Sequence, residues 1–430
     1  MFPAACGHGQ IDIVREFLKD PRVDVNAIQH QKATPFLIAC EKGHTAVVKL
    51  LMADPRVDIN RPRDTGATPF YLACQENCVD VVKLLLKDLR VDVTRQSDSG
   101  ATPLYIACAK GNVEIVELLL NDGRFDPGKA DSGHSTPFYS ACFNGHLQVV
   151  DLLLKHGQVD VNRDRDGFTP FYVACFKNHL KVVERLLHDP RVDVNQTQAQ
   201  GATPFYVVCE FGNIDVVRAL MRHVHVDVTK PTINGVTPFY IACERNHVEV
   251  VKLLLLDPRT NVNEPRNDGV TPLWISCQTG LLEVIKWVLV SPRDVDTKAR
   301  WSGNHKTGAE QARQKGHLIA ADLVELYEKD QETVRQKLRL ELGISEANAS
   351  ETFALVIFLC DDYLRIIDSS RASEKTTRAM RFFSIASRLN MDLQMVLCNR
   401  LHRLGRDVVS LKSSETAFRA VLKKLSYSDS

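Results

Sequence analysis

The segment TPFYLACQENCVDVVKLLLKDLRVDV, from Thr68 to Val93, contains the pattern that decides the fold. Thr68 is a good helix N-cap, and Pro69 suits the first helical position because proline has no N–H to leave unpaired there. Two groups of apolar residues then predict a short helix with a buried face and a second helix after a turn. They are Phe70, Leu72, Ala73 and Cys74 in the first helix, and Val81, Val82, Leu84, Leu85 and Leu86 in the second.

The Thr-Pro dipeptide recurs every 33 or 34 residues, which indicates a solenoid built from repeated units. Its threonines are Thr34, Thr68, Thr102, Thr136, Thr169, Thr203, Thr237 and Thr271. A cysteine near the end of each first helix keeps the same period, at Cys40, Cys74, Cys108, Cys142, Cys175, Cys209, Cys243 and Cys277. We therefore interpret these cysteines as small core residues and not as a disulfide framework.

The unit resembles the ankyrin repeat. In one unit the matching residues are TPFYIAC from Thr237, Asn246-His247 at the turn, VVKLL from Val250, Asn261-Val262-Asn263, and Asp268-Gly269 in the finger. Two departures recur: tyrosine replaces the usual histidine near the start, and one extra residue ends the second helix, as in Asp54-Pro55-Arg56. The resemblance implies an all-α solenoid of helix pairs joined by short β-turn fingers.

We divide the chain into an array, residues 1–329, and a helical C-terminal domain, residues 330–430. The array is expected to hold eight full repeats and a degenerate repeat at each end, because the opening repeat lacks its Thr-Pro and the last begins at Thr307. Beyond Lys329 the period stops, and apolar spacing predicts helices that begin with Gln331 to Leu342.

Charge and composition limit the classes of partner. Lys and Arg number 54 against 53 Asp and Glu, for a net charge of +1, which argues against nucleic acid as the main partner. No apolar run approaches the ~20 residues of a membrane-spanning helix. The first residues carry Arg15 and Glu16 and lack a secretory pattern. We expect a monomeric cytoplasmic protein, with the nucleus as the alternative compartment.

The motifs that carry catalysis are absent: the sequence has no P-loop, no His-Glu-x-x-His and no Gly-x-Ser-x-Gly. Four Cys-x3-His pairs, such as Cys142 and His146, offer the residue types of a zinc site. Zinc needs ligands that converge within about 2.3 Å of one point, and the cysteines hold core-facing positions in separate repeats. We expect no enzymatic activity, no cofactor and no metal, and predict that each turn histidine hydrogen-bonds its neighbour.

The resemblance implies that the two residues ending each first helix lie on a concave face, beside the finger tips. Three successive repeats place phenylalanine there, and contiguous apolar surface tends to mark a binding site. The alternative is that these rings pack against neighbouring helices or the finger. We interpret the tyrosines near the starts of these helices as inter-repeat packing. The candidate partner-binding residues are Phe143, Phe176, Lys177, Glu210, Phe211, Glu244 and Arg245, with Arg163 and Arg165 on one finger.

The prediction is a protein-interaction scaffold that binds a partner protein on the concave face and fingers of the array. One alternative is an adaptor that presents a substrate to a modifying enzyme, such as a ubiquitin ligase, through the C-terminal domain. Another is a basic C-terminal domain that binds an acidic partner, lipid or nucleic acid under regulation by the array. Its candidate residues, Arg371, Lys375, Arg378 and Arg381, are spaced to share one helix face, and the alternative is that this face is a solvated surface.

Overall fold

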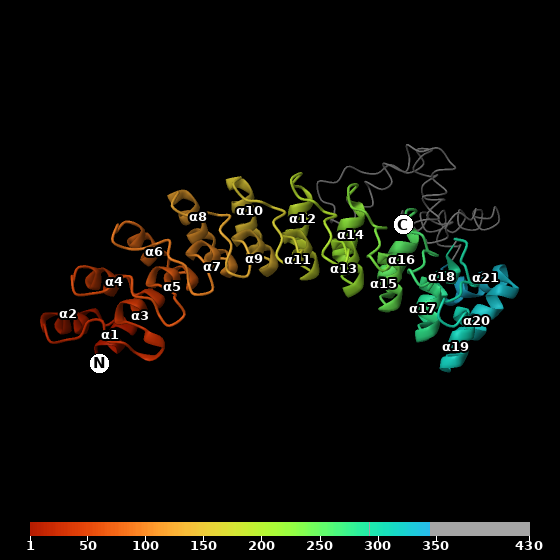
Figure 1. The fold of residues 1–430 in the computed structure, drawn as a ribbon, viewed down its shortest axis with the longest axis horizontal. Coiled ribbons are helices and arrows are strands. Elements are labelled where there is room, and N and C mark those ends of the chain that lie inside the picture. The colour runs from red at the N-terminus through yellow and green to blue at the C-terminus, as the bar shows by residue number, and fades with distance from the viewer. Residues whose placement is uncertain (292, 345–430) are drawn as a thin grey trace, which may run out of the picture. The chain divides into compact units, whose positions relative to one another are not determined.

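The computed structural model describes residues 1–291 and 293–344, which divide into two compact units between Ile233 and Asn234. The described residues form helix pairs separated by turns and short loops (Figure 1), and the predicted all-α ankyrin-type solenoid is confirmed. The predicted basic residues Arg371, Lys375, Arg378 and Arg381 lie outside the described residues.

The first unit, residues 1–233, consists of seven successive helix pairs. In Figure 1 the first helices of the pairs form one row and the second helices form another. The pairs are α1 (Phe2–Gly7) with α2 (Ile11–Lys19), α3 (Pro35–Glu41) with α4 (Thr45–Met52), α5 (Pro69–Gln75) with α6 (Val79–Leu86), α7 (Pro103–Lys110) with α8 (Val113–Asp122), α9 (Pro137–Asn144) with α10 (Leu147–His156), α11 (Pro170–Phe176) with α12 (Leu180–Leu187), and α13 (Pro204–Phe211) with α14 (Ile214–Arg222).

The second unit is described from residue 234 to residue 344, apart from residue 292. It contains α15 (Pro238–Glu244), α16 (Val248–Leu256), α17 (Pro272–Thr279), α18 (Leu282–Val290), α19 (Gly308–Lys315), α20 (Leu318–Lys329) and α21 (Gln331–Glu341). The helix predicted from Gln331 is present and packs against α18 and α20. Arg335 on α21 donates a hydrogen bond from Nη2 to the carbonyl oxygen of Arg293 at 2.8 Å.

The Thr-Pro dipeptide starts the first helix of each regular pair, as the sequence predicts. Thr68 Oγ1 accepts a hydrogen bond from the backbone N–H of Tyr71 at 3.2 Å, and the side chain of Thr68 is buried. This cap supplies a partner to an N–H group that the helix leaves without one. Most of the predicted apolar residues of this pair are buried, namely Phe70, Leu72, Ala73, Cys74, Val81, Val82 and Leu85, whereas Leu84 and Leu86 are half-buried.

Hydrogen bonds between successive repeats join both the turns and the fingers. Nε2 of His179 donates to the carbonyl oxygen of Phe143 at 2.9 Å, and His44 and His146 make the same bond to the repeat before them. The predicted bond from a turn histidine to its neighbour is therefore confirmed at these positions. In the fingers, the N–H of Asp98 donates to the carbonyl oxygen of Thr65 at 3.0 Å. These bonds set the register of one repeat on the next.

Candidate partner-binding groove

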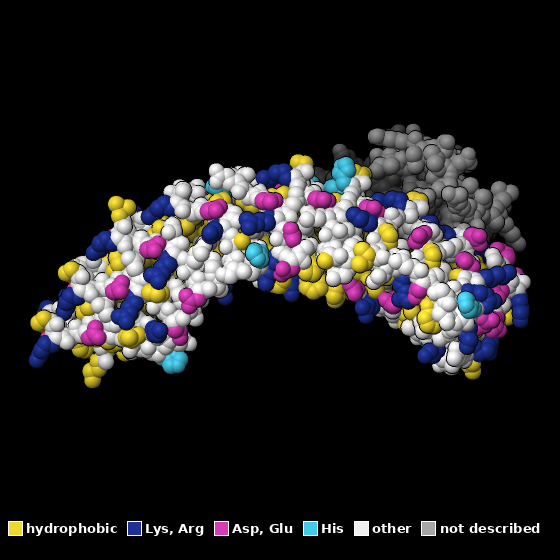
Figure 2. Space-filling model, in the orientation of Figure 1, with side chains coloured by type: hydrophobic (Ala, Val, Ile, Leu, Met, Phe, Trp, Pro, Cys, Tyr) yellow, Lys and Arg dark blue, Asp and Glu magenta, His cyan; other side chains and the backbone are white. Residues whose placement is uncertain are grey.

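A groove lined mainly by aromatic side chains opens where α9, α11 and α13 end in the first unit. Its volume is about 380 Å³. Figure 2 shows hydrophobic side chains gathered along the edge beneath α11 and α13. We call it the aromatic groove, and its lining residues are Tyr139, Phe143, Phe168, Tyr172, Val173, Phe176, Val207, Glu210 and Phe211.

The three phenylalanines of the concave-face prediction meet in this groove. Phe143, Phe176 and Phe211 keep 36%, 39% and 52% of their surface exposed. The rings of Phe176 and Phe211 meet edge to face with centroids 5.1 Å apart, and Phe143 stacks on Tyr139 at 6.3 Å. Each ring is thus held by a neighbouring ring while part of it stays accessible to solvent.

The repeat places these rings together because they occupy nearly the same position in three successive helices. Phe143 and Phe176 each stand seven residues after the threonine that caps their helix, and Phe211 stands eight residues after Thr203. The helices themselves stack directly, α9 on α11 and α11 on α13. The spacing of the repeat therefore creates one continuous aromatic surface from residues more than thirty positions apart.

Phe168 also lines the groove, and the sequence prediction missed it. It precedes Thr169 at a position where the other regular repeats carry alanine, serine or valine. Its ring packs against Tyr172 with centroids 5.2 Å apart, and its backbone pairs with Arg165 across the shortened finger. The sequence signal that could have identified Phe168 is its size, because the equivalent position in the other regular repeats holds a smaller residue. Tyr139 and Tyr172 are buried between repeats, as predicted, yet their rings also line the groove.

The charged groups at the groove are Lys177 and Glu210. The ammonium nitrogen of Lys177 lies 4.4 Å from the ring centroid of Phe143 and 5.3 Å from that of Phe176. Burial raises the pKa of the Tyr172 hydroxyl, and the nearby carboxylate of Glu210 raises it further. Tyr172 is therefore a neutral hydroxyl at physiological pH, and the groove combines an apolar floor with one positive and one negative group.

The family model for ankyrin repeats (3 copies) matches overlapping stretches that together cover most of the chain. The matched residues are 2–97, 53–131, 104–198, 182–264 and 205–300. The chain belongs to the ankyrin repeat family. Ankyrin repeats generally mediate protein–protein interaction, and proteins built from them are typically non-enzymatic interaction modules.

A search of the curated protein sequences gives no match to this ankyrin repeat chain. Among solved structures, the chain is similar to the human ASB11 ankyrin repeat domain, with 24% sequence identity and a TM-score of 0.43. The similar region covers 51% of this chain and 96% of that domain. Among the described residues, no helix combines the length and apolar character needed to cross a membrane.

The other predicted site residues of the ankyrin array lie around or away from the groove. Arg165 is not a lining residue. Burial raises the pKa of the Tyr139 hydroxyl, and Arg165 lies close enough to Tyr139 for its charge to lower that pKa. Arg163 donates to the carbonyl oxygen of Gly128 at 3.1 Å and is not a lining residue. Glu244 ends α15 and Arg245 follows it, so both belong to the second unit.

The repeat cysteines of the array are buried thiols. Burial raises the pKa of each of them above its ordinary value, for example Cys142 and Cys175. Three of the turn histidines beside them, His44, His146 and His179, bond to backbone carbonyl groups of the preceding repeat. No group of three or more side chains suited to a metal ion occurs in the described part of the chain. The Cys-x3-His spacing is accounted for by packing and by these bonds.

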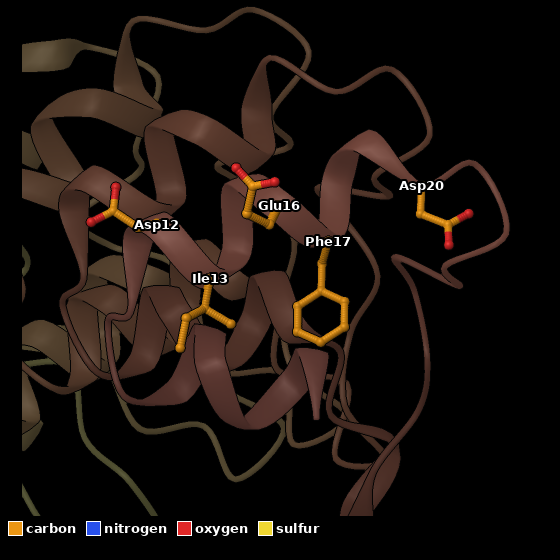
Figure 3. A pocket seen from close by; sticks show the side chains of 5 residues that line it. All are labelled: Asp12, Ile13, Glu16, Phe17 and Asp20. Carbon is orange, nitrogen blue, oxygen red and sulfur yellow. The ribbon is translucent and has the colours of Figure 1, made fainter.

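A second hollow lies on the outer side of α2, with a volume of about 540 Å³ (Figure 3). Ile13 and Phe17 point the same way from the helix, and Asp12 and Glu16 point away from them. The carboxylate of Asp12 pairs with Arg15 at 3.0 Å, and that of Glu16 pairs with Lys19 at 2.7 Å. Asp20 also lines the hollow and pairs with Arg22 at 2.8 Å. Because all three carboxylates already have partners, this hollow offers less for recognition than the aromatic groove.

Proposed function

We propose that this ankyrin array is a protein-interaction scaffold that docks a partner protein in the aromatic groove of its first unit. The observation that carries the proposal is the partial exposure of three adjacent rings, Phe143, Phe176 and Phe211, at concave-face positions. Binding energy in protein interfaces concentrates in a few large residues at the centre of a contact, surrounded by a polar rim. The groove has that arrangement, with Lys177, Glu210 and Arg165 around the rings.

The rigidity of the site also supports the proposal. His179 holds the carbonyl group of Phe143, and Phe176 and Phe211 hold each other edge to face. Side chains that are already ordered lose less conformational entropy when a partner binds, so more of the contact energy appears as affinity. A contiguous, preformed aromatic surface of this kind is typical of a binding site, whereas single exposed apolar residues are common on any protein surface.

The test is a comparison of partner capture by the full chain and by a variant in which Phe143, Phe176 and Phe211 are changed to serine. We expect at least one partner to bind the unchanged chain and to lose several kcal/mol of affinity for the variant, because the contacts of three central aromatic residues are removed. Titration calorimetry with the purified partner measures this loss, and circular dichroism checks that helix content is kept.

The control variant changes Leu89 and Val224 to serine. These side chains are 92% and 83% exposed and do not line the groove. The control should retain full affinity for the same partner. If the triple serine variant binds every partner as well as the unchanged chain does, the groove is not the docking site.

A further inference from the structure

Lys177 lies at the rim of the aromatic groove, and its ammonium group contacts two of the rings. Its ammonium group lies over Phe143 and Phe176, and no carboxylate of the described residues forms an ion pair with it. Lys177 is exposed to solvent. A cation over an aromatic face at an exposed site gains little free energy. A carboxylate brought close to this ammonium would form a stronger, charge-assisted hydrogen bond.

The finger carboxylates on this side of the first unit are engaged elsewhere. Asp131 accepts hydrogen bonds from the N–H groups of Gly133 and Ser135, at 3.0 and 2.8 Å. Asp164 accepts from the N–H of Gly167 at 2.7 Å. These carboxylates stabilise the turns of their own fingers, and neither forms an ion pair with Lys177.

The positive character extends to both sides of Lys177. Lys110 ends α7, one repeat before Phe143, and is exposed. Arg165 lies at the rim beside Tyr139, and its ion pair with Asp166 is long, at 3.8 Å. Positive side chains therefore gather at the α9 and α11 end of the groove, and the carboxylate of Glu210 lines its α13 end. A ligand carboxylate is favoured beside Lys177 and disfavoured beside Glu210, so the two ends of the groove differ in the charge that they accept.

We infer that the occupant of the aromatic groove is a short peptide segment that carries bulky apolar side chains next to a carboxylate, and that Lys177 pairs with this carboxylate. The inference rests on the proposed function and names the chemistry of the partner. A volume of about 380 Å³ is at the lower end of the ~300–1,000 Å³ typical of ligand pockets, which suits a few side chains of one segment. The rings contribute affinity, and Lys177 discriminates among apolar segments by charge.

The experiment selects peptides from a phage-displayed random library on the full-length chain. The expected consensus has two or more large apolar residues with Asp or Glu close by. A synthetic peptide of that consensus is then titrated by fluorescence anisotropy against the unchanged chain and against Lys177→Glu. Charge reversal should weaken binding at least about tenfold, because an attractive charge contact becomes a repulsive one. A peptide in which the acidic residue is replaced by lysine should recover affinity for Lys177→Glu.

Lys181→Glu is the matched control. Lys181 is an exposed lysine of the same repeat, on α12 and outside the groove, so its reversal should leave peptide affinity unchanged. Lys177→Met keeps the apolar stem over the rings and removes the charge. Lys177→Met should weaken binding of the acidic peptide less than Lys177→Glu does. It should not increase affinity for the lysine-substituted peptide.

The outcomes separate this inference from the proposed function. Peptides that need the three phenylalanines but ignore Lys177→Glu would overturn the carboxylate pairing and leave the docking groove standing. Peptides that bind equally well to the triple serine variant would overturn both. A consensus rich in lysine or arginine would show that the groove takes a cation and would overturn the inference. Failure to enrich any peptide would rule out a short segment as the occupant.

Discussion

Nη2 of Arg191 donates a hydrogen bond to the carbonyl oxygen of Leu154 at 3.2 Å, which ties the exit of α12 to the end of α10 in the preceding repeat. Asp189 orients the guanidinium, with Nε to Oδ1 at 2.9 Å and Nη2 to Oδ2 at 2.7 Å. The same arrangement links Arg56 to Leu18, Arg90 to Met52 and Arg124 to Leu86. The extra residue that lengthens many of these repeats thus belongs to a segment that fastens adjacent repeats together.

Arg191→Ala should lower the free energy of unfolding by about 1–2 kcal/mol, because it removes charge-assisted hydrogen bonds and leaves the nearly buried Asp189 without its partner. The side chain of Arg191 is 41% exposed, so solvent screens part of the ion pair and the loss stays modest. Urea unfolding followed by circular dichroism measures it. Arg95→Ala, at an exposed position, should behave like the unchanged chain, and equal effects of the two changes would contradict the role given to Arg191.

Stability should decrease in acid because of the same carboxylates. Hydrogen bonds from the paired arginines hold the pKa of Asp54, Asp88, Asp122 and Asp189 below the ordinary value of about 3.9. A pKa lowered by folding stabilises the folded state above the unfolded value, and that stabilisation is lost as the pH falls towards the folded value. Thermal unfolding midpoints should therefore be flat above about pH 5 and drop below about pH 4.

The matched variant for the acid dependence carries asparagine at these four positions. Asparagine keeps the shape of the side chain and the Oδ1 atom that accepts hydrogen bonds, but it does not titrate in this range. The variant should start from a lower midpoint at neutral pH and lose less on acidification. Parallel pH profiles for the two proteins would show that other carboxylates govern the acid response.

Leu254→Ala should lower the free energy of unfolding of the second unit by about 2–5 kcal/mol, through lost burial and a residual cavity. Leu254 is fully buried in α16, as the sequence predicts for the centre of a second helix. Leu256→Ala is the control on the same helix. Because Leu256 is 40% exposed, its replacement should lower the free energy of unfolding much less. All three tryptophans, Trp274, Trp287 and Trp301, lie in the second unit, so their fluorescence reports its unfolding directly. Similar losses of unfolding free energy for the two variants would show that the buried face of α16 is assigned wrongly.

Gly145→Ala should destabilise the first unit more than Gly123→Ala. Both glycines have a positive φ, 76° and 77°, so alanine introduces comparable backbone strain at each, about 1–2 kcal/mol. A Cβ at Gly145 would lie 2.6 Å from Nδ1 of His179, whereas nothing lies within 4 Å of a Cβ at Gly123. Chemical unfolding of the two variants isolates the steric contribution. Adding His179→Ala to Gly145→Ala should remove the clash, and identical losses for the two single variants would argue against this close packing.

The sequence by itself determined the helix pairs and their core. Thr68, Pro69 and the apolar spacing that follows act within one repeat, where capping and helical periodicity are local effects, so the pattern could be recognised without a structure. The burial of Leu254 and the repeat cysteines followed from the same spacing. The histidine bonds, such as that of His179, were predictable because the same turn recurs and can reach only the repeat beside it.

Only the tertiary structure decided which side chains join the three predicted phenylalanines in the aromatic groove. Phe168 belongs to a finger and Phe211 to α13, so their meeting depends on how one repeat is staggered on the next. The position of Lys177 over Phe143 and the bond from Arg191 to Leu154 likewise join residues of different repeats. Within one repeat, spacing specifies which way a side chain points. Contacts between repeats depend on the rotation and offset of the stack, which are set by packing over the whole interface and leave no local pattern in the sequence.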